Sequence, residues 1–296
     1  MLSRRRALQT LLAAPIVAGA ASCKRSSVVK VGSKNFSESV LLGEIVTQHL
    51  AAKGLKTEHQ ANLGGSFICH QAMLAGDLDV YVEYTGTALV AILKDTRDPP
   101  LKDPVEVRSE VERRYRDEFG ILWLPALGFD DTFAILVRKA EADKLGLVTV
   151  SDLAAHASKL RPGFGYEFVK RSDGYEALVK SYALVFKDPP LTMELGLTYR
   201  ALAESKVDVI AGNSTSGLID KLDLVQLVDD KHFFPPYEAA PVVRKAVADA
   251  HPDVVTALAA LGGKLTTKTM RALNASIDAD GKSAKEVATG FLATMQ

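Results

Sequence analysis

The sequence predicts an α/β protein made of two similar lobes. Two stretches, residues 79–89 and residues 207–215, each contain a short apolar run typical of a buried strand, which stops at a polar turn leading into a helical pattern. Asn213 lies 129 residues after Tyr84, and the aspartates that precede the two strands have the same offset. Because such a repeat indicates two copies of one structural unit, we expect two α/β lobes.

Each of these two junctions also has the geometry of a ligand site. The end of a strand and the start of the next helix direct free backbone N–H groups and the positive end of the helix dipole to one point. Tyr84 stands at this point in the first copy and Asn213 in the second. A single junction more often reflects an ordinary crossover with Tyr84 as a packing residue, whereas two facing junctions predict a small-molecule cleft between the lobes.

The N-terminal segment has the pattern of an export signal. Three arginines precede an apolar run at residues 11–21 that is too short to span a bilayer, and small residues lead into Cys23. This ending resembles a bacterial lipobox, although Ala20 stands where leucine is usual. We therefore predict a signal peptide at residues 1–22, lipid attachment at Cys23, and a location on the periplasmic or extracellular face of a bacterial cytoplasmic membrane. The segment also resembles a twin-arginine signal, so the export route stays open.

Composition and charge argue against nucleic-acid binding and indicate one buried free cysteine. The 296 residues include 36 Lys and Arg and 36 Asp and Glu, and loss of residues 1–22 would remove three arginines and no acid, leaving a net charge of about −3. This balance gives no basic surface for nucleic acid. Cys69 is the only cysteine besides Cys23 and lies among apolar residues, so we expect it to be a buried free thiol.

The first lobe is expected to begin with a strand at residues 28–33 followed by a helix. Asn35, with Glu38 three residues later, resembles a capping box at the start of this helix. Lys34 lies between strand and helix at the same end of the sheet as Tyr84, where it is either a ligand contact or a solvated lysine. The next elements are expected to be a strand at 56–60, a turn and helix after 62–66, the junction at 79–89, a polar loop at 94–104, a charged helix with a solvated face to residue 118, and a strand at 121–124.

The second lobe is expected to be entered through an apolar strand that follows a turn at residue 128. Arg171 lies in a glycine- and aromatic-rich loop, where its guanidinium either forks onto a carboxylate or is exposed. We expect the lobes to comprise residues 28–133 with 240–296, and residues 134–239. Further elements are predicted at 140–145, 151–155, 174–182, 207–215 and 224–228, followed by a return at 233–244 and three helices within 252–296.

Five short motifs stand in a fixed order along nearly the whole mature chain. They are Gly32-Ser33-Lys34-Asn35-Phe36, Asn62-Leu63-Gly64-Gly65, Glu83-Tyr84-Thr85-Gly86-Thr87, the segment 129–133, and Phe234-Pro235-Pro236-Tyr237. In this order they resemble the substrate-binding proteins of osmoprotectant ABC importers, which bind glycine betaine, choline or carnitine. The resemblance implies a type II periplasmic-binding-protein fold, in which two α/β lobes joined by two hinge crossings close around a ligand. It also implies a membrane permease and its ATPase as partners, and we expect a monomer.

The same resemblance implies a cage of aromatic residues around a quaternary ammonium group, with basic residues at the carboxylate. A permanent cation without an N–H group can be held only by such aromatic faces. Phe133 and Asn213 stand where the family usually has tyrosine, and Ser216 replaces an acidic residue. The implied ligand-binding residues are Lys34, Asn35, Tyr84, Thr85, Thr87, Phe133, Arg171, Asn213 and Tyr237.

The departures at these positions favour a functionalised betaine over glycine betaine, because an amide at Asn213 suits a ligand with a hydrogen-bonding group. Another trimethylated or amino-acid-like metabolite, or a role as a sensor that presents its ligand to a receptor, stays open. An enzyme is disfavoured because the chain has no metalloprotease helix, no P-loop and no complete nucleophile elbow; residues 212–217 come nearest. We expect no catalytic residues, no cofactor and no metal, since the six histidines are scattered without ligand spacing.

Overall fold

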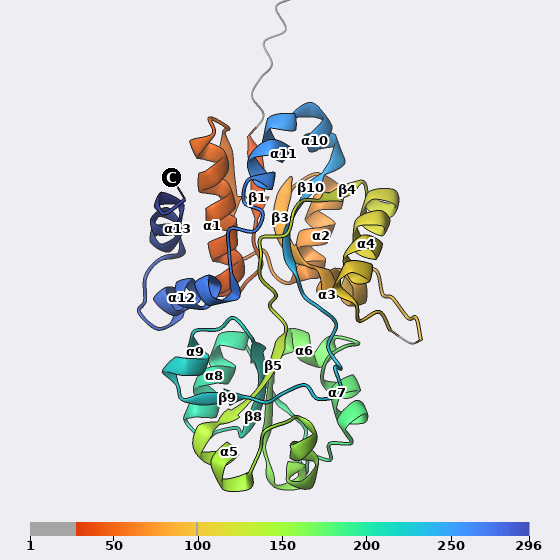
Figure 1. Cartoon of the computed structure of the whole chain (residues 1–296), viewed down its shortest axis with the longest axis vertical. Coiled ribbons are helices and arrows are strands. Elements are labelled where there is room, and N and C mark those ends of the chain that lie inside the picture. Colours follow the sequence, from red (N-terminus) through yellow and green to blue (C-terminus); the bar gives the residue numbers. More distant parts are fainter. Residues whose placement is uncertain (1–27, 99, 296) are drawn as a thin grey trace, which may run out of the picture.

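The protein is described by a computed structural model that covers residues 28–98 and 100–295. The predicted signal peptide and Cys23 lie outside these residues. Figure 1 shows two α/β lobes arranged one after the other along the long axis of the molecule, with two chain segments running between them. The predicted two-lobe α/β fold is confirmed by the two separate five-stranded sheets.

Lobe 1 is built on a mixed sheet with the strand order β2-β1-β3-β10-β4. Strands β1, β2 and β3 are parallel, whereas β10 is antiparallel to both of its neighbours. All five residues of β3 are buried, which agrees with its mostly apolar sequence; the exception, Glu83, is paired with Lys34. The strands are β1 (Val29–Gly32), β2 (Thr57–Gln60), β3 (Val80–Tyr84), β4 (Ile121–Trp123) and β10 (Ala239–Arg244).

Helices cover both faces of this sheet (Figure 1). Asp103 caps α4 by accepting the N–H groups of Val105 and Glu106, and Ser283 forms a capping box with Glu286 at α13. The three helices predicted after residue 252 are present. The helical elements of lobe 1 are α1 (Ser37–Ala52), α2 (Ser66–Ala75), α3 (Thr85–Thr87), η1 (Ala88–Ile92), α4 (Pro104–Arg114), η2 (Tyr115–Phe119), α10 (Lys245–Ala250), α11 (Pro252–Ala259), α12 (Thr267–Asp278) and α13 (Ala284–Ala293).

Lobe 2 repeats this plan with the strand order β7-β6-β8-β5-β9, in which β5 is antiparallel to its neighbours. Its strands are β5 (Phe133–Arg138), β6 (Pro162–Gly165), β7 (Leu191–Met193), β8 (Val209–Asn213) and β9 (Leu224–Gln226). Its helical elements are α5 (Lys139–Leu145), η3 (Ser151–Ala155), η4 (Ala157–Lys159), α6 (Tyr166–Lys170), α7 (Tyr175–Tyr182), α8 (Leu195–Ala203) and α9 (Leu218–Lys221). The chain crosses between the sheets once between β4 and β5 and once between β9 and β10. The residue boundaries of the lobes stay a prediction.

The repeated aspartates have the same structural role in both lobes. Each accepts the backbone N–H of a residue at the start of a neighbouring parallel strand, and each pairs with the arginine that ends the neighbouring antiparallel strand. The contacts are Asp79 with Lys30 N (2.9 Å) and Arg244 Nη2 (2.5 Å), and Asp208 with Arg161 N (3.0 Å) and Arg138 Nη2 (2.6 Å). The first matched residues of the 129-residue repeat, Asp79 and Asp208, therefore have a structural role. They lie at the end of each sheet that is away from the cleft.

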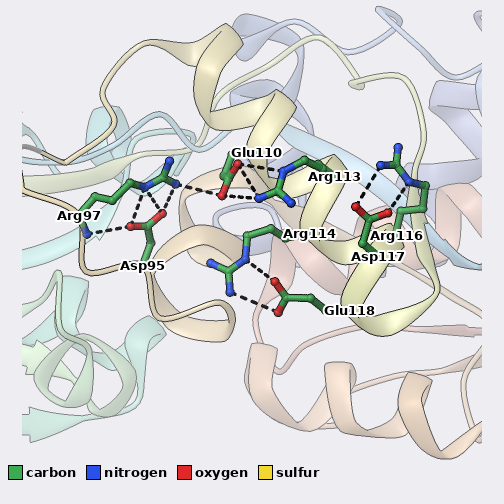
Figure 2. Close-up of polar contacts among 8 residues, drawn as sticks. All are labelled: Asp95, Arg97, Glu110, Arg113, Arg114, Arg116, Asp117 and Glu118. Carbon is green, nitrogen blue, oxygen red and sulfur yellow. Dashed lines mark hydrogen bonds and ion pairs between the residues drawn. The ribbon is translucent and has the colours of Figure 1, made fainter.

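The charged segment after residue 94 carries a balanced set of ion pairs on the outside of lobe 1 (Figure 2). Four arginines pair with four acids, so the paired side chains leave no excess of positive charge. Exposed pairs of this kind contribute at most about 1 kcal/mol each, so we assign this face a solvation role. The pairs join Arg97 with Asp95 and Glu110, Arg113 with Glu110, Arg114 with Glu118, and Arg116 with Asp117.

Two further observations concern the remaining cysteine and membrane-spanning helices. Cys69 is a buried free thiol, as predicted, and burial raises the pKa of the thiol to about 11. A thiol with a raised pKa stays protonated and reacts poorly, so we assign Cys69 a packing role and no redox role. Within the described part of the chain, no helix combines the length and the apolar character needed to cross a bilayer.

Candidate functional site

The two repeated junctions meet between the lobes. Asn213, which ends β8, lines a cavity of about 500 Å³ with walls from both lobes. Tyr84, which ends β3, does not line this cavity, but its hydroxyl donates to Glu38, which does. This volume lies within the usual range of small-molecule sites. Residues that line it include Asn35, Phe36, Glu38 and Asn274 from lobe 1, and Tyr199, Asn213, Thr215 and Ser216 from lobe 2.

An aromatic cluster lies at the crossings between the lobes. The ring centroids of Phe133 and Tyr237 are 5.6 Å apart with their planes at 81°, so these two predicted cage residues are brought together. Phe168 and Phe234 complete the cluster, with centroids 4.9 Å and 5.5 Å from that of Phe133. The sequence reasoning missed both of them, although Phe168 lies in the aromatic-rich loop and Phe234 opens a motif that it had singled out.

Arg171 places its guanidinium against these rings. The guanidinium carbon lies 5.2 Å from the centroid of Phe133 and 5.9 Å from that of Tyr237, within the range of a cation–π contact. Its Nε and Nη2 donate to the two oxygens of Asp173 at 2.7 Å and 2.6 Å, and its Nη1 donates to Thr87 Oγ1 in lobe 1 at 3.2 Å. Arg171 therefore joins the two lobes, and its charge is balanced by an aspartate of the protein.

Lys34 has a similar arrangement in lobe 1. Its Nζ lies 2.5 Å from Glu83 Oε1 and 4.6 Å from the centroid of the Tyr84 ring, and all three side chains are buried. The structure thus brings Lys34 and Tyr84 together as predicted. It also shows that both predicted carboxylate-binding cations have internal acidic partners, because Lys34 is paired with Glu83 as Arg171 is with Asp173.

The remaining predicted residues of lobe 1 lie close by. The Thr85 hydroxyl donates to Pro236 O at 3.0 Å and accepts the Glu238 N–H, so it ties the β3–α3 turn to the returning crossing. Asn35 lines the cavity. The expected capping box at Asn35 is wrong: the N-cap of α1 is Phe36 and no side chain caps it, because Glu38 points into the cleft instead.

Glu38 is the centre of a buried polar cluster that the sequence reasoning did not find. It is 3% exposed, and it accepts hydrogen bonds from Tyr84 Oη at 2.6 Å and from Asn274 Nδ2 at 2.7 Å. Its Oε2 lies 2.5 Å from Thr215 Oγ1, which is also 2.8 Å from Asp131 Oδ1. The predicted site residue Asn213 joins this cluster through Asp131, since its Nδ2 donates to Asp131 Oδ2 at 2.8 Å.

Burial dominates the electrostatics of this cluster. Burial raises the pKa of the Glu38 carboxyl, and hydrogen bonds from Thr215, Tyr84 and Asn274 oppose this effect. Burial also raises the pKa of Asp131 well above its usual value, and the neighbouring Glu38 carboxyl adds to the rise. The cavity wall formed by Glu38, Asn213 and Asn274 therefore presents carboxyl and amide groups.

The comparison with known proteins identifies the family. A family described as the substrate-binding domain of ABC-type glycine betaine transport systems, OpuAC, matches residues 27–294. The chain belongs to this family. Its members are substrate-binding proteins and not enzymes, which confirms the predicted class of function and the absence of an enzymatic role.

Individual relatives bind different solutes according to their names. The chain is 35% identical over 263 residues to the ergothioneine transport permease and binding protein EgtU of Helicobacter pylori, matching 88% of this chain but 46% of that protein. It thus spans about half the length of this relative. It is 36% identical over 267 residues to the carnitine transport binding protein OpuCC of Listeria monocytogenes, covering 89% of this chain and 85% of that protein.

Solved structures support the same fold. A crystal structure of a glycine betaine/carnitine/choline ABC transporter is 36% identical in sequence, with a TM-score of 0.75. The match covers 90% of this chain and 98% of that chain. Apo YehZ from Escherichia coli matches with 31% identity and a TM-score of 0.67. The two-lobe architecture of this chain is therefore that of the family's binding proteins.

Proposed function

We propose that this chain captures a small betaine between its lobes and delivers it to an ABC permease that is driven by an ATPase. The observation that carries the proposal is the aromatic cluster of Phe133 and Tyr237, whose faces hold the guanidinium of Arg171. A site that accommodates one cation in this way has the chemistry to hold a methylated ammonium. Tyr84, beside Lys34, supplies a second aromatic surface at the same cleft.

The carboxylate of the ligand is proposed to bind Lys34 and Arg171. Each of these cations is paired with an internal carboxylate, so the ligand carboxylate would share or replace one of those contacts. Thr87 is the natural third partner because its hydroxyl already lies 3.2 Å from Arg171 Nη1. A charge-assisted hydrogen bond of this kind stabilises a complex by about 1.5–3 kcal/mol.

The ligand is proposed to be a functionalised betaine and not glycine betaine itself. Asn213 occupies a position where the family usually has a tyrosine, and the cavity of about 500 Å³ opens beside it with polar groups in its walls. A substituent that offers hydrogen-bonding groups fits this space. Ergothioneine, which appears in the name of the EgtU relative, is such a betaine because it carries a ring with N–H groups. Carnitine, which appears in the name of OpuCC, carries a hydroxyl.

The export signal and Cys23 support anchoring to the outer face of the cytoplasmic membrane by a lipid. Expression of a Cys23→Ala variant in the native host tests this part of the proposal. The variant is expected in the soluble fraction, and its retention in the membrane would contradict a lipid anchor. A neighbouring receptor gene in place of permease and ATPase genes would favour the sensor role.

The ligand is tested by a thermal-shift screen of ergothioneine, carnitine, choline and glycine betaine. A ligand present at one hundred times its Kd stabilises the folded protein by about 2.7 kcal/mol. Phe133→Ala should remove this stabilisation, because it takes away the central ring of the cluster. Phe119→Ala is the matched control, since Phe119 packs against His70 and Tyr115 in lobe 1 and not against the cleft.

A further inference from the structure

Two carboxyl groups from different parts of the cleft meet at one hydroxyl. Glu38 lies in the first turn of α1, Asp131 lies in the crossing before β5, and Thr215 follows β8 in lobe 2. Thr215 Oγ1 is 2.5 Å from Glu38 Oε2 and 2.8 Å from Asp131 Oδ1. Both distances are those of hydrogen bonds.

A count of hydrogens shows that this bridge is incomplete. The Thr215 hydroxyl has one hydrogen, so it can donate to only one of the two carboxyl groups. The second contact is a hydrogen bond only if the other carboxyl is protonated and donates to Thr215 Oγ1.

Within residues 28–98 and 100–295, no basic side chain forms an ion pair with either carboxyl. Glu38 faces Tyr84 from β3 and Asn274 from α12, and both donate to it. Asp131 accepts from Asn213 Nδ2 and from the Thr215 N–H. The nearby charged groups include the Lys34–Glu83 pair at the Tyr84 ring, Asp130, which accepts the Tyr237 N–H, and Asp278, which accepts from Ser37. Arg271 donates to Ser214 O at 2.8 Å, and the hydroxyl of the titratable Tyr199 accepts the Asn213 N–H.

We propose that the closed cleft binds one proton, shared by Glu38 and Asp131 through Thr215, so that closure around the ligand takes up a proton. The proposal rests on the proposed function in one respect, namely that ligand binding closes the lobes. Burial raises the pKa of both carboxyl groups in the closed structure, which agrees with a retained proton. Opening would expose them to water, where carboxyl groups have pKa values of about 4.

The sign of the effect follows from these directions. A pKa that is higher in the closed state favours closure at low pH, and this contribution is fully present below the open-state value. Above that value the affinity falls about tenfold per pH unit for each proton taken up, until the raised closed-state pKa is passed. The ligand therefore binds more tightly in mildly acidic medium and is released more easily as the pH rises.

Calorimetry in buffers of different ionisation enthalpy counts the protons directly. With mature protein and ergothioneine or carnitine at pH 6, we expect uptake close to one proton per ligand. Glu38→Gln and Asp131→Asn should each abolish this uptake, because either amide supplies the donor permanently. Asp117→Asn is the control: Asp117 is an exposed residue paired with Arg116 outside the cleft, so the proton uptake of this variant should equal that of the wild type. Zero uptake in the wild type, or unchanged uptake in both bridge variants, overturns the proposal.

A second readout needs no ligand and separates this proposal from the proposed function. Small-angle scattering of the mature protein alone, recorded between pH 7 and pH 5, should show a more compact form as the pH falls. The Glu38→Gln, Asp131→Asn double variant should show no such change. If no betaine binds but the compaction occurs in the wild type only, the proposed function fails and the proton site stands. If the scattering of wild type and double variant responds identically to pH, the proton site fails.

Discussion

The guanidinium carbon of Arg171 lies 5.2 Å from the centroid of the Phe133 ring, so a residue predicted to bind the ligand's carboxylate occupies the face predicted to bind its cation. Asp173 neutralises the guanidinium on its other side, with Nε and Nη2 each on one carboxylate oxygen. The arrangement makes Arg171 both a partner for an incoming carboxylate and a competitor for the aromatic face. Its substitution should therefore affect acidic and neutral ligands differently.

Arg171→Ala is expected to weaken the binding of carnitine or ergothioneine by roughly tenfold to one hundredfold, because a charge-assisted hydrogen bond is lost. Choline, which has no carboxylate, should bind as well as before or better, since the aromatic face is freed. Calorimetric titration of both ligand types measures the difference. Arg116→Ala is the control, because Arg116 is an exposed residue paired only with Asp117. Equal losses for choline and carnitine would show that Arg171 does not read the carboxylate.

Asn213→Tyr is expected to restore an aromatic wall where the family usually has one. Glycine betaine should gain affinity, since a desolvated cation–π contact contributes ~0.5–2 kcal/mol. A functionalised betaine should lose affinity, because the new ring would fill the space beside the cavity and break the bond from Asn213 to Asp131. Paired titrations with glycine betaine and ergothioneine decide this. If glycine betaine binds the wild type tightly and binds the variant equally well, residue 213 does not determine which betaine is bound.

Gly86→Ala is expected to destabilise the β3–α3 turn, because a Cβ at this position would lie 2.8 Å from both Pro236 O and the Tyr237 ring. Overpacking of this kind costs ~1–3 kcal/mol. The urea midpoint of the variant should fall accordingly. Gly196→Ala is the matched control, since a Cβ there would meet open space. If the urea midpoint shifts no more than that of the control, the segment with Pro236 and Tyr237 can move aside at little cost in stability.

Asp208→Asn is expected to lower stability at neutral pH but not in strong acid. Burial tends to raise the pKa of Asp208, yet hydrogen bonds from Arg161 and Arg138 lower it to about 2. A depressed pKa stabilises the fold above the unfolded-state value near ~4, and the contribution of about 2 kcal/mol is lost as the pH falls through about 2. Denaturant curves of wild type and variant should therefore converge between about pH 4 and pH 2. The exposed Asp188→Asn change should show no such convergence, and a constant gap for Asp208→Asn would refute the assignment.

The two lobes could be predicted from the sequence because the repeat matches residues at both the start and the end of one strand in each lobe. Asp79 and Asp208 fix the start of β3 and β8 through the same backbone contacts, and Tyr84 and Asn213 end these strands at the cleft. These features are local in the chain, so their spacing is visible without a structure. Phe133 and Tyr237 were identified through the family motifs, and they meet because the two crossings run side by side.

Other parts of the site depend on pairings that no local pattern reveals. Glu38 fits a capping box by its spacing from Asn35, yet its carboxylate turns toward Thr215, which is 177 residues away in the chain. The carboxylate partners of Lys34 and Arg171 were missed for a related reason. No local pattern marks Glu83 or Asp173 as the partner of a buried cation, and only the folded structure places each of them beside its lysine or arginine.

The most direct test of the account is a calorimetric titration of the mature wild-type protein, and of its Tyr237→Ala variant, with ergothioneine, carnitine, choline and glycine betaine. The proposed aromatic site predicts that at least one carboxylate-bearing betaine binds the wild type with a stoichiometry of one. It also predicts that Tyr237→Ala, which removes a ring that contacts both Phe133 and Arg171, abolishes this binding. Failure of every quaternary ammonium compound to bind, or undiminished binding to a folded Tyr237→Ala protein, would contradict the aromatic site.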